Sequence, residues 1–184
     1  SMTKAMVALG LILGQSGAPL SEVGIDEKLG QTIPLELSFL DEKGQKVVLK
    51  DLIDKPTVLT LVYFRCAGIC SPLLNGVVDV VNKADLELGK DFQVITVSFD
   101  DRDGPELAAD KKANYLKQLK VTVPDRGWRF LTGDAASSRR LADSVGFRYR
   151  REGEDFIHPA SLFVLSPQGK IARYMYGITY LPFD

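Results

Sequence analysis

The chain has 184 residues, of which 45% are hydrophobic and 26% are charged, and its formal net charge is −1. This length predicts one domain with a substantial core, and the scattered, balanced charges argue against a nucleic-acid-binding protein. The sequence contains two cysteines and one histidine, His158, which excludes any metal site that needs two imidazoles from one chain.

The first 22 residues are expected to be a leader or the remnant of a membrane anchor. Residues 5–13 form an apolar run of nine residues, which has the length of a signal-peptide core and is too short to span a bilayer. An apolar helix packed on the domain would explain the same run. The domain itself is expected over residues 23–184, and Pro182 looks like the entry to a further helix, so we expect the domain to be cut before a C-terminal helix.

Apolar runs and turn residues predict an N-terminal β-hairpin over residues 31–48, with its turn at Lys43-Gly44. Helices alternate with buried strands in the remainder of the chain, which predicts an α/β domain with a central mixed sheet flanked by helices. A cysteine pair after the first core strand and a closing hairpin match the plan of the thioredoxin fold. The strands are expected at 57–64, 92–99, 128–131, 161–165 and 171–176, and the helices after Ser71, at about 105–120 and at 134–145. Lys50 to Asp54 is expected to be a short connection.

Cys66 and Cys70 stand four residues apart, where the first core strand turns into a helix. At a helix N-terminus the unpaired N–H groups and the helix dipole favour anions, so a thiol there loses its proton more easily. Thiolate attacks disulfides and binds soft metals. A structural disulfide or two inert thiols are the alternative, but a disulfide between such close cysteines constrains little of the unfolded chain. CxxC spacing would indicate a thioredoxin-like redox pair; the wider CxxxC suits two thiolates that share an ion.

His158 precedes a strand that the predicted fold places beside the cysteine strand. Because Pro159 follows it, its backbone is expected to be extended, as at a strand entry. A histidine in a surface loop is the alternative. Two thiolates and one imidazole form a soft ligand set that suits copper, whereas a closed zinc site usually needs a fourth protein ligand, and none is obvious.

Asp100, Asp101 and Asp103 follow the second core strand, in the region where ligands often bind to such sheets. We nevertheless expect a solvated loop in which Asp103 caps the next helix. Arg65 either lowers the pKa of the neighbouring thiol or is a surface charge. Three aromatic residues near the cysteines are expected to belong to the core: Tyr63, Phe64 and Phe156.

Three segments resemble the Sco/SenC family of thioredoxin-like copper proteins, in the family's order: YFRCAGICSPLLN, VITVSFDDRDGPE and DFIHPASLFVLSPQGKIARYMYG. The resemblance runs from about residue 24 to the end. It implies that Cys66, Cys70 and His158 bind Cu(I) or Cu(II), and that the protein helps to metallate the dinuclear copper centre of cytochrome c oxidase. It also hints that an acidic residue after the second core strand serves the site or partner docking.

The chain departs from the family pattern beside both cysteines. The family usually has a proline after each cysteine, and this chain has Ala67 and Ser71 there. This departure is expected to alter the stiffness of the loop, and with it copper affinity or redox potential, but it leaves each implied ligand in place.

The first functional hypothesis is a copper-binding metallochaperone. We expect it to be a monomer of an extracytoplasmic compartment (the bacterial periplasm or the outer face of the inner membrane), with no membrane contact except through an N-terminal anchor. Its partner would be the oxidase subunit that carries the dinuclear copper centre, or another copper protein. Because the cysteines bind metal only when reduced, copper loading and a disulfide should exclude each other.

Two enzymatic alternatives use the same cysteines. A thiol–disulfide oxidoreductase would use Cys66 and Cys70 as a redox pair. It would reduce the copper-site cysteines of the oxidase or act as a redox sensor. It would not need His158. A thiol peroxidase ranks lower, because the sequence offers few hydrogen-bond donors for a peroxide beyond Arg65 and backbone N–H groups.

Overall fold

The structure is a computed structural model, and it describes residues 23–66 and 70–177, without the side chains of Cys70 and Ser71. The leader or anchor predicted at 1–22 and the end of the chain at 178–184 lie outside the described residues. Within the described part, no helix is long and apolar enough to cross a membrane.

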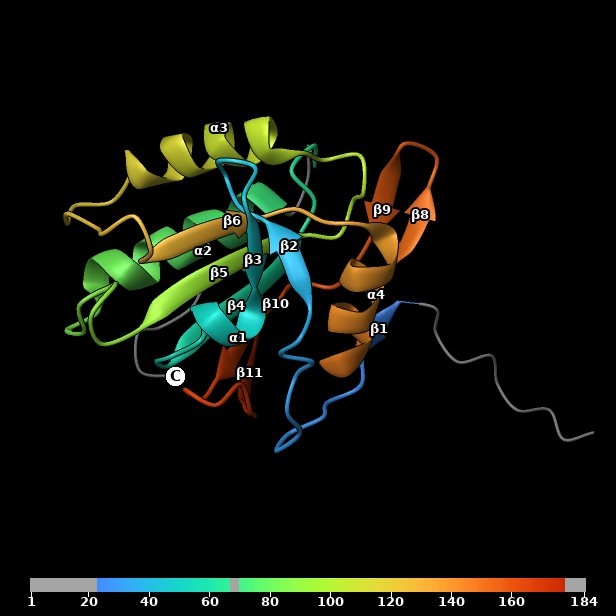
Figure 1. Cartoon of the computed structure of the whole chain (residues 1–184), viewed down its shortest axis with the longest axis horizontal. Coiled ribbons are helices and arrows are strands. Elements are labelled where there is room, and N and C mark those ends of the chain that lie inside the picture. Colours follow the sequence, from blue (N-terminus) through green and yellow to red (C-terminus); the bar gives the residue numbers. More distant parts are fainter. Residues whose placement is uncertain (1–22, 67–69, 178–184) are drawn as a thin grey trace, which may run out of the picture.

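A five-stranded mixed sheet forms the centre of the domain, with the order β11-β10-β4-β5-β6 (Figure 1). The three strands β4 to β6 run parallel, and β10 and β11 run antiparallel to their neighbours. Every residue of β5 and β6 is buried, as expected for apolar strands that are covered on both faces. The strands are β4 (Thr57–Val62), β5 (Gln93–Ser98), β6 (Trp128–Leu131), β10 (Ser161–Leu165) and β11 (Ile171–Tyr176).

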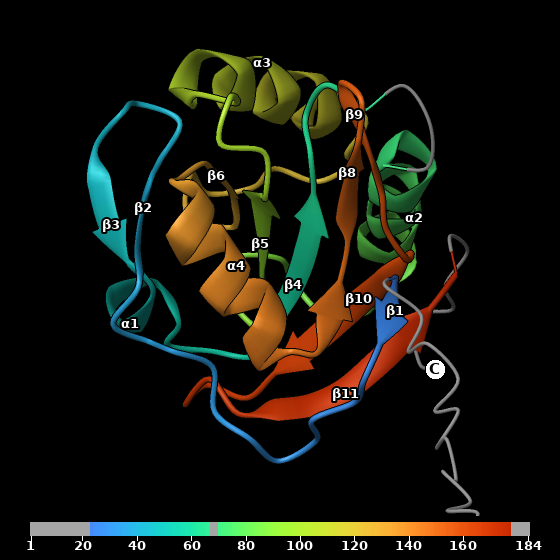
Figure 2. The ribbon, with the colours of Figure 1, turned by 90° about the vertical axis from the view of Figure 1, so that its right-hand side faces the viewer.

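Helices cover both faces of this sheet. Helix α2 (Cys70–Lys83) lies on one face and α4 (Ala135–Ser144) on the other, while α3 (Pro105–Leu116) contacts α2 and β6 (Figure 2). Five apolar residues of α2 recur at helical spacing and are buried: Leu73, Leu74, Val77, Val78 and Val81. The predicted α/β class, with a central mixed sheet flanked by helices, is confirmed.

The N-terminal hairpin is also confirmed, with β2 (Ser38–Leu40) antiparallel to β3 (Lys46–Val48). It protects the edge of the sheet, because Leu40 and Thr132 form a β-bridge and the Glu42 carboxylate accepts the Phe130 N–H of β6 at 2.7 Å. The connection predicted over 50–54 instead contains a short helix, α1 (Leu49–Leu52).

Two further strand pairs extend the domain beyond the main sheet. The first joins β1 (Gly24–Ile25) to β7 (Phe147–Arg148), 122 or more residues apart in the chain, and the sequence pattern did not predict it. The second is a hairpin of β8 (Arg150–Glu152) and β9 (Asp155–Ile157), with Gly153 in its turn. This second hairpin rises at the end of the sheet where β4 leads toward α2 (Figure 2).

Candidate functional site

The cysteine motif lies at the carboxyl end of β4, as predicted. The strand ends at Val62, and the Cys66 N–H donates to the carbonyl of Tyr63 at 3.2 Å, so the chain turns there. Cys66 is buried, with 8% of its surface exposed, and Cys70 is the first residue of α2. Residues 67–69 and the side chain of Cys70 lie outside the described part of the chain.

His158 is buried next to this turn and is not a surface histidine. Because β10 is antiparallel to β4, with Leu162 opposite Thr60, the segment before β10 lies beside the end of β4. The imidazole is only 9% exposed. Its ring centroid lies 5.4 Å from that of Phe99 and 5.8 Å from that of Tyr63, so the strand pairing brings His158 into the aromatic core beneath the turn.

The hydrogen bonding of His158 defines its tautomer. Its Nδ1 lies 2.9 Å from the carbonyl oxygen of Pro159. A carbonyl oxygen only accepts hydrogen bonds, so Nδ1 carries a proton, and in the neutral imidazole Nε2 then carries the lone pair. A backbone carbonyl on the opposite nitrogen is the usual arrangement of a metal-binding histidine, because it fixes both the tautomer and the ring orientation.

Tyr63 belongs to the core, as predicted, with 4% of its surface exposed. It also links the cysteine to the histidine, a role that the sequence analysis did not predict. Its side chain is hydrogen-bonded to that of Cys66, and its ring meets His158 edge-on at 83°. Its hydroxyl also lies 3.4 Å from Asp155 Oδ1. Burial first, and then the bond to Cys66, raises the pKa of Tyr63 far above its ordinary value. The sequence did offer a signal for this role. A tyrosine at the end of a buried strand needs a polar partner for its hydroxyl.

The three-residue ligand set is only partly described by the structure. Where side chains are described, no three His, Cys, Asp or Glu residues lie together as a metal-binding group. The predicted set includes Cys70, whose side chain is outside that part. The structure therefore places two of its members, Cys66 and His158, against the same tyrosine, with the backbone of Cys70 at the start of the helix that follows.

Asp103 does not cap helix α3, contrary to the prediction. The N-cap is Gly104, which makes no side-chain capping bond. The Asp103 carboxylate is fully buried and accepts the Phe64 N–H and the Ser98 hydroxyl, each at 2.7 Å, while Arg65 Nε lies 3.2 Å from its other oxygen. Burial raises its pKa above the ordinary value. The carboxylate thus bonds to the backbone just before Cys66, which is why it is unavailable to the helix.

Asp100 is also buried, so the predicted solvated loop is wrong for it and for Asp103. Arg102 binds the Asp100 carboxylate through two nitrogens, with Nε 2.9 Å from Oδ1 and Nη2 2.7 Å from Oδ2. Burial alone would raise the pKa of Asp100, but the hydrogen bonds from Arg102 outweigh it and lower that pKa. Asp101 is exposed, as predicted, and lies 3.7 Å from Arg151.

Arg65 faces the acidic loop. Its side chain is 54% exposed, pairs with Asp103, and donates to the carbonyl of Arg102 at 3.1 Å. The sequence predicted that Arg65 either lowers the pKa of the neighbouring thiol or is a surface charge. The geometry adds a structural role, because Arg65 connects the residue before Cys66 to the loop after β5.

Comparison with known proteins identifies the family. The SCO1/SenC family model matches residues 26–180. The SCO1 protein homolog of Bacillus subtilis (strain 168) is 27% identical over 152 residues, which are 80% of this chain and 75% of that protein. A crystal structure from Aquifex aeolicus VF5, provisionally described as an electron transfer protein, is 31% identical, with a TM-score of 0.76 over 85% of this chain and 89% of that one.

Bradyrhizobium japonicum ScoI, solved with copper bound, shares the fold at 23% identity, with a TM-score of 0.61 over 84% of this chain and 93% of that one. The predicted thioredoxin-like fold agrees with these structures, and the family match covers both the cysteine turn and the histidine. The chain belongs to the SCO1/SenC family.

Proposed function

We propose that this protein binds copper through Cys66, Cys70 and His158 and passes it to the copper centre of cytochrome c oxidase. The observation that carries the proposal is the burial of His158, 92 residues after Cys66 in the sequence, against the tyrosine that contacts that cysteine. Copper-bound relatives support the metal. A further structural relative, BsSco, is described as a member of the Sco family of cytochrome c oxidase assembly proteins.

The donor set fits a copper ion that is carried as cargo. Two thiolates and one imidazole are soft ligands that suit Cu(I), and imidazole is compatible with both copper oxidation states. Three protein ligands leave the coordination sphere partly open, so a partner's ligand can enter before the ion leaves. The cysteines must lose their protons to bind. His158 would bind the ion through Nε2, because its Nδ1 is bonded to the Pro159 carbonyl.

The surroundings of His158 hold the ring in one orientation. Phe99, Phe147 and Tyr63 all pack against the imidazole, with centroid distances of 5.4 to 6.0 Å. Aromatic packing of this kind limits ring rotation and excludes water from the side of the imidazole that faces the core. The ligand is therefore preorganised before the metal arrives.

The test is a copper titration of the fully reduced protein beside its His158→Ala and Cys66→Ser/Cys70→Ser variants. We expect near-stoichiometric Cu(II) binding with a thiolate charge-transfer band, and binding weakened by at least about tenfold without the imidazole. Since the chain has one histidine, no other imidazole replaces it. If the reduced protein binds copper no better than the double-serine variant, the proposal is wrong.

The thiol–disulfide oxidoreductase remains the second candidate, because Cys66 and Cys70 border a strand-to-helix turn where a thiolate is stabilised. The His158→Ala variant separates the two. A reductase should retain most of its activity on a disulfide-bonded peptide of the oxidase copper site, whereas a copper carrier loses its metal affinity. By either proposal the protein acts as a monomer in an extracytoplasmic compartment.

A further inference from the structure

The β8–β9 hairpin leads directly into His158, yet little of it is buried. Five of its six strand residues are exposed, and only Phe156 is partly buried. A two-stranded hairpin of three residues per strand is marginally stable by itself. Contacts outside the hairpin must therefore fix the position of the end of β9. Because His158 follows β9 directly, the same contacts fix the position of His158.

Phe156 provides the apolar contact. Its ring lies 5.0 Å from that of Tyr63 and 5.2 Å from that of Phe99, the same two rings that contact His158. The Arg151 guanidinium also lies over the Phe156 ring, 4.8 Å from its centroid. The hairpin and the histidine therefore share one aromatic support.

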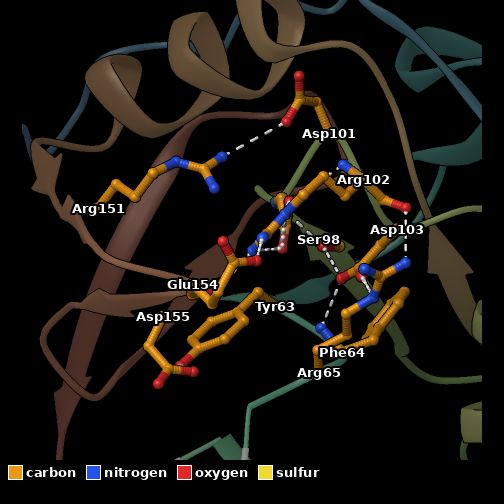
Figure 3. Close-up of polar contacts among 11 residues, drawn as sticks. Tyr63, Phe64, Arg65, Ser98, Asp101, Arg102, Asp103, Arg151, Glu154 and Asp155 are labelled. Carbon is orange, nitrogen blue, oxygen red and sulfur yellow. Dashed lines mark hydrogen bonds and ion pairs between the residues drawn. The ribbon is translucent and has the colours of Figure 1, made fainter.

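Arg102 provides the polar contact, and it reaches the hairpin from the loop after β5. Its Nη1 lies 2.6 Å from Glu154 Oε2, and its Nη2 donates to the backbone carbonyl of Glu154 at 2.7 Å (Figure 3). Glu154 is in the turn of the hairpin. The same guanidinium is held on its other side by the buried carboxylate of Asp100.

We propose that Arg102 is a positioning residue that bonds the β8–β9 hairpin to the loop after β5 and so holds His158 beside Cys66. The inference rests on the proposed copper function for its metal readout, but the contacts themselves do not depend on that function. Arginine suits this role because its planar group binds the Asp100 carboxylate with two nitrogens and still directs donors toward Glu154. A lysine has the charge without this fork, so it can satisfy one side at a time.

The first experiment measures copper affinity in four variants. Arg102→Met removes every contact of the guanidinium and leaves the backbone bonds of Arg102 in place. Arg102→Lys keeps the positive charge near Asp100, so it guards against misfolding. Glu154→Gln removes only the exposed ion pair, since the backbone carbonyl remains. Arg140→Met is the matched control, because Arg140 makes a 2.6 Å ion pair with Glu36 on another surface.

We expect copper affinity to fall about tenfold in Arg102→Met, less in Arg102→Lys, under about twofold in Glu154→Gln, and not at all in Arg140→Met. The same changes are then made in the His158→Ala background. If Arg102 acts through the histidine, Arg102→Met should have no further effect there. An equal loss of affinity in both backgrounds would show that Arg102 acts on copper by another route and would overturn the proposal.

The second experiment needs no metal. Hydrogen exchange of residues 150–158 is compared between the unmodified protein, Arg102→Lys and Arg140→Met in the reduced, copper-free state. We expect at least about tenfold faster exchange in this segment for Arg102→Lys alone, with exchange of β4 and β5 unchanged. Unchanged exchange in the hairpin would refute the positioning role even if copper binds. Faster exchange in a protein that binds no copper would refute the proposed function and leave the positioning role intact.

Discussion

At the scale of single residues, the site depends on polar groups placed in apolar surroundings. Tyr63 is 4% exposed, and Asp100 and Asp103 have fully buried carboxylates. Buried polar groups are stable only when they are hydrogen-bonded, and the partners of these three lie on the cysteine turn, the loop after β5 or the β8–β9 hairpin. Asp103 thereby joins the loop after β5 to the cysteine turn, and Tyr63 joins that turn to the β8–β9 hairpin, whereas Asp100 holds Arg102 within its own loop.

Tyr63→Phe tests the contact between the tyrosine and the cysteine. The change keeps the ring and removes the hydroxyl that is bonded to Cys66. A hydrogen bond to a metal-bound thiolate withdraws charge from the sulfur, so its loss should move the Cu(II) charge-transfer band to longer wavelength. The free energy of unfolding should fall by about 0.5–1.5 kcal/mol. Visible absorption of the copper complex and urea denaturation measure the two effects.

Tyr149→Phe is the matched control for this change. Tyr149 is equally buried and stacks on Phe99 at 4.2 Å, but its contacts are with Arg139 and the aromatic core. Its variant should leave the copper band in place. A band that shifts equally in both variants would mean that the spectrum reports general packing and not the Tyr63 contact.

At the scale of elements, a close backbone approach joins the N-terminal strand to the end of α4. Gly146 follows this helix with φ at 69°, and its carbonyl accepts the Asp26 N–H at 2.8 Å. A side chain at Gly146 would overlap the Asp26 carbonyl oxygen. Glycine is required here both for the left-handed backbone and for space, and this contact holds β1 beside β7.

Gly146→Ala should therefore destabilise the domain more than a conformational cost alone explains. Gly153 is the control, because its φ is 62° and nothing lies within 4 Å of the position that a Cβ would take. We expect Gly153→Ala to cost about 1–2 kcal/mol and Gly146→Ala about 3 kcal/mol or more, since overlap adds to the strain. Equal losses of free energy of unfolding in urea would contradict the close approach.

At the scale of the whole molecule, ion pairs and capping bonds make the fold sensitive to acid. Several carboxylates have pKa values lowered by hydrogen bonds or nearby cations: Glu36, Asp54, Asp100, Asp125 and Asp134. Asp103, with a raised pKa, acts in the opposite direction. A carboxyl with a lowered pKa in the folded state stabilises it above the ordinary pKa and loses that contribution as the pH falls through the folded value.

The urea midpoint should consequently fall as the pH is lowered from about 5 to about 3. Asp134→Asn is an informative variant, because asparagine caps a helix as well as aspartate does and can still accept the Ser137 N–H. It should unfold at a similar midpoint near neutral pH and show a smaller decline in acid. A midpoint that is unchanged or rises between pH 5 and 3 would show that the raised pKa of Asp103 dominates.

The sequence by itself determined the parts of this protein that depend on local pattern. Apolar runs located all five strands of the central sheet, and the spacing of apolar residues located α2. The N-terminal hairpin followed from its turn, and the position of Cys66 and Cys70 followed from the strand and helix around them. Each of these features is encoded by residues close together in the sequence, because hydrophobic periodicity and turn chemistry act over short distances.

Only the tertiary structure decided which polar groups are buried and with what they pair. The sequence predicted His158 before a strand beside the cysteine strand, but only the structure showed that its ring is buried against Tyr63 and Phe99. Asp103 resembled a helix cap, and its actual partner at Phe64 is 39 residues away. Arg102 contacts Glu154 across 52 residues. The physical reason is that the partner of a buried polar group is chosen by the packing of distant segments, and no local pattern encodes that choice.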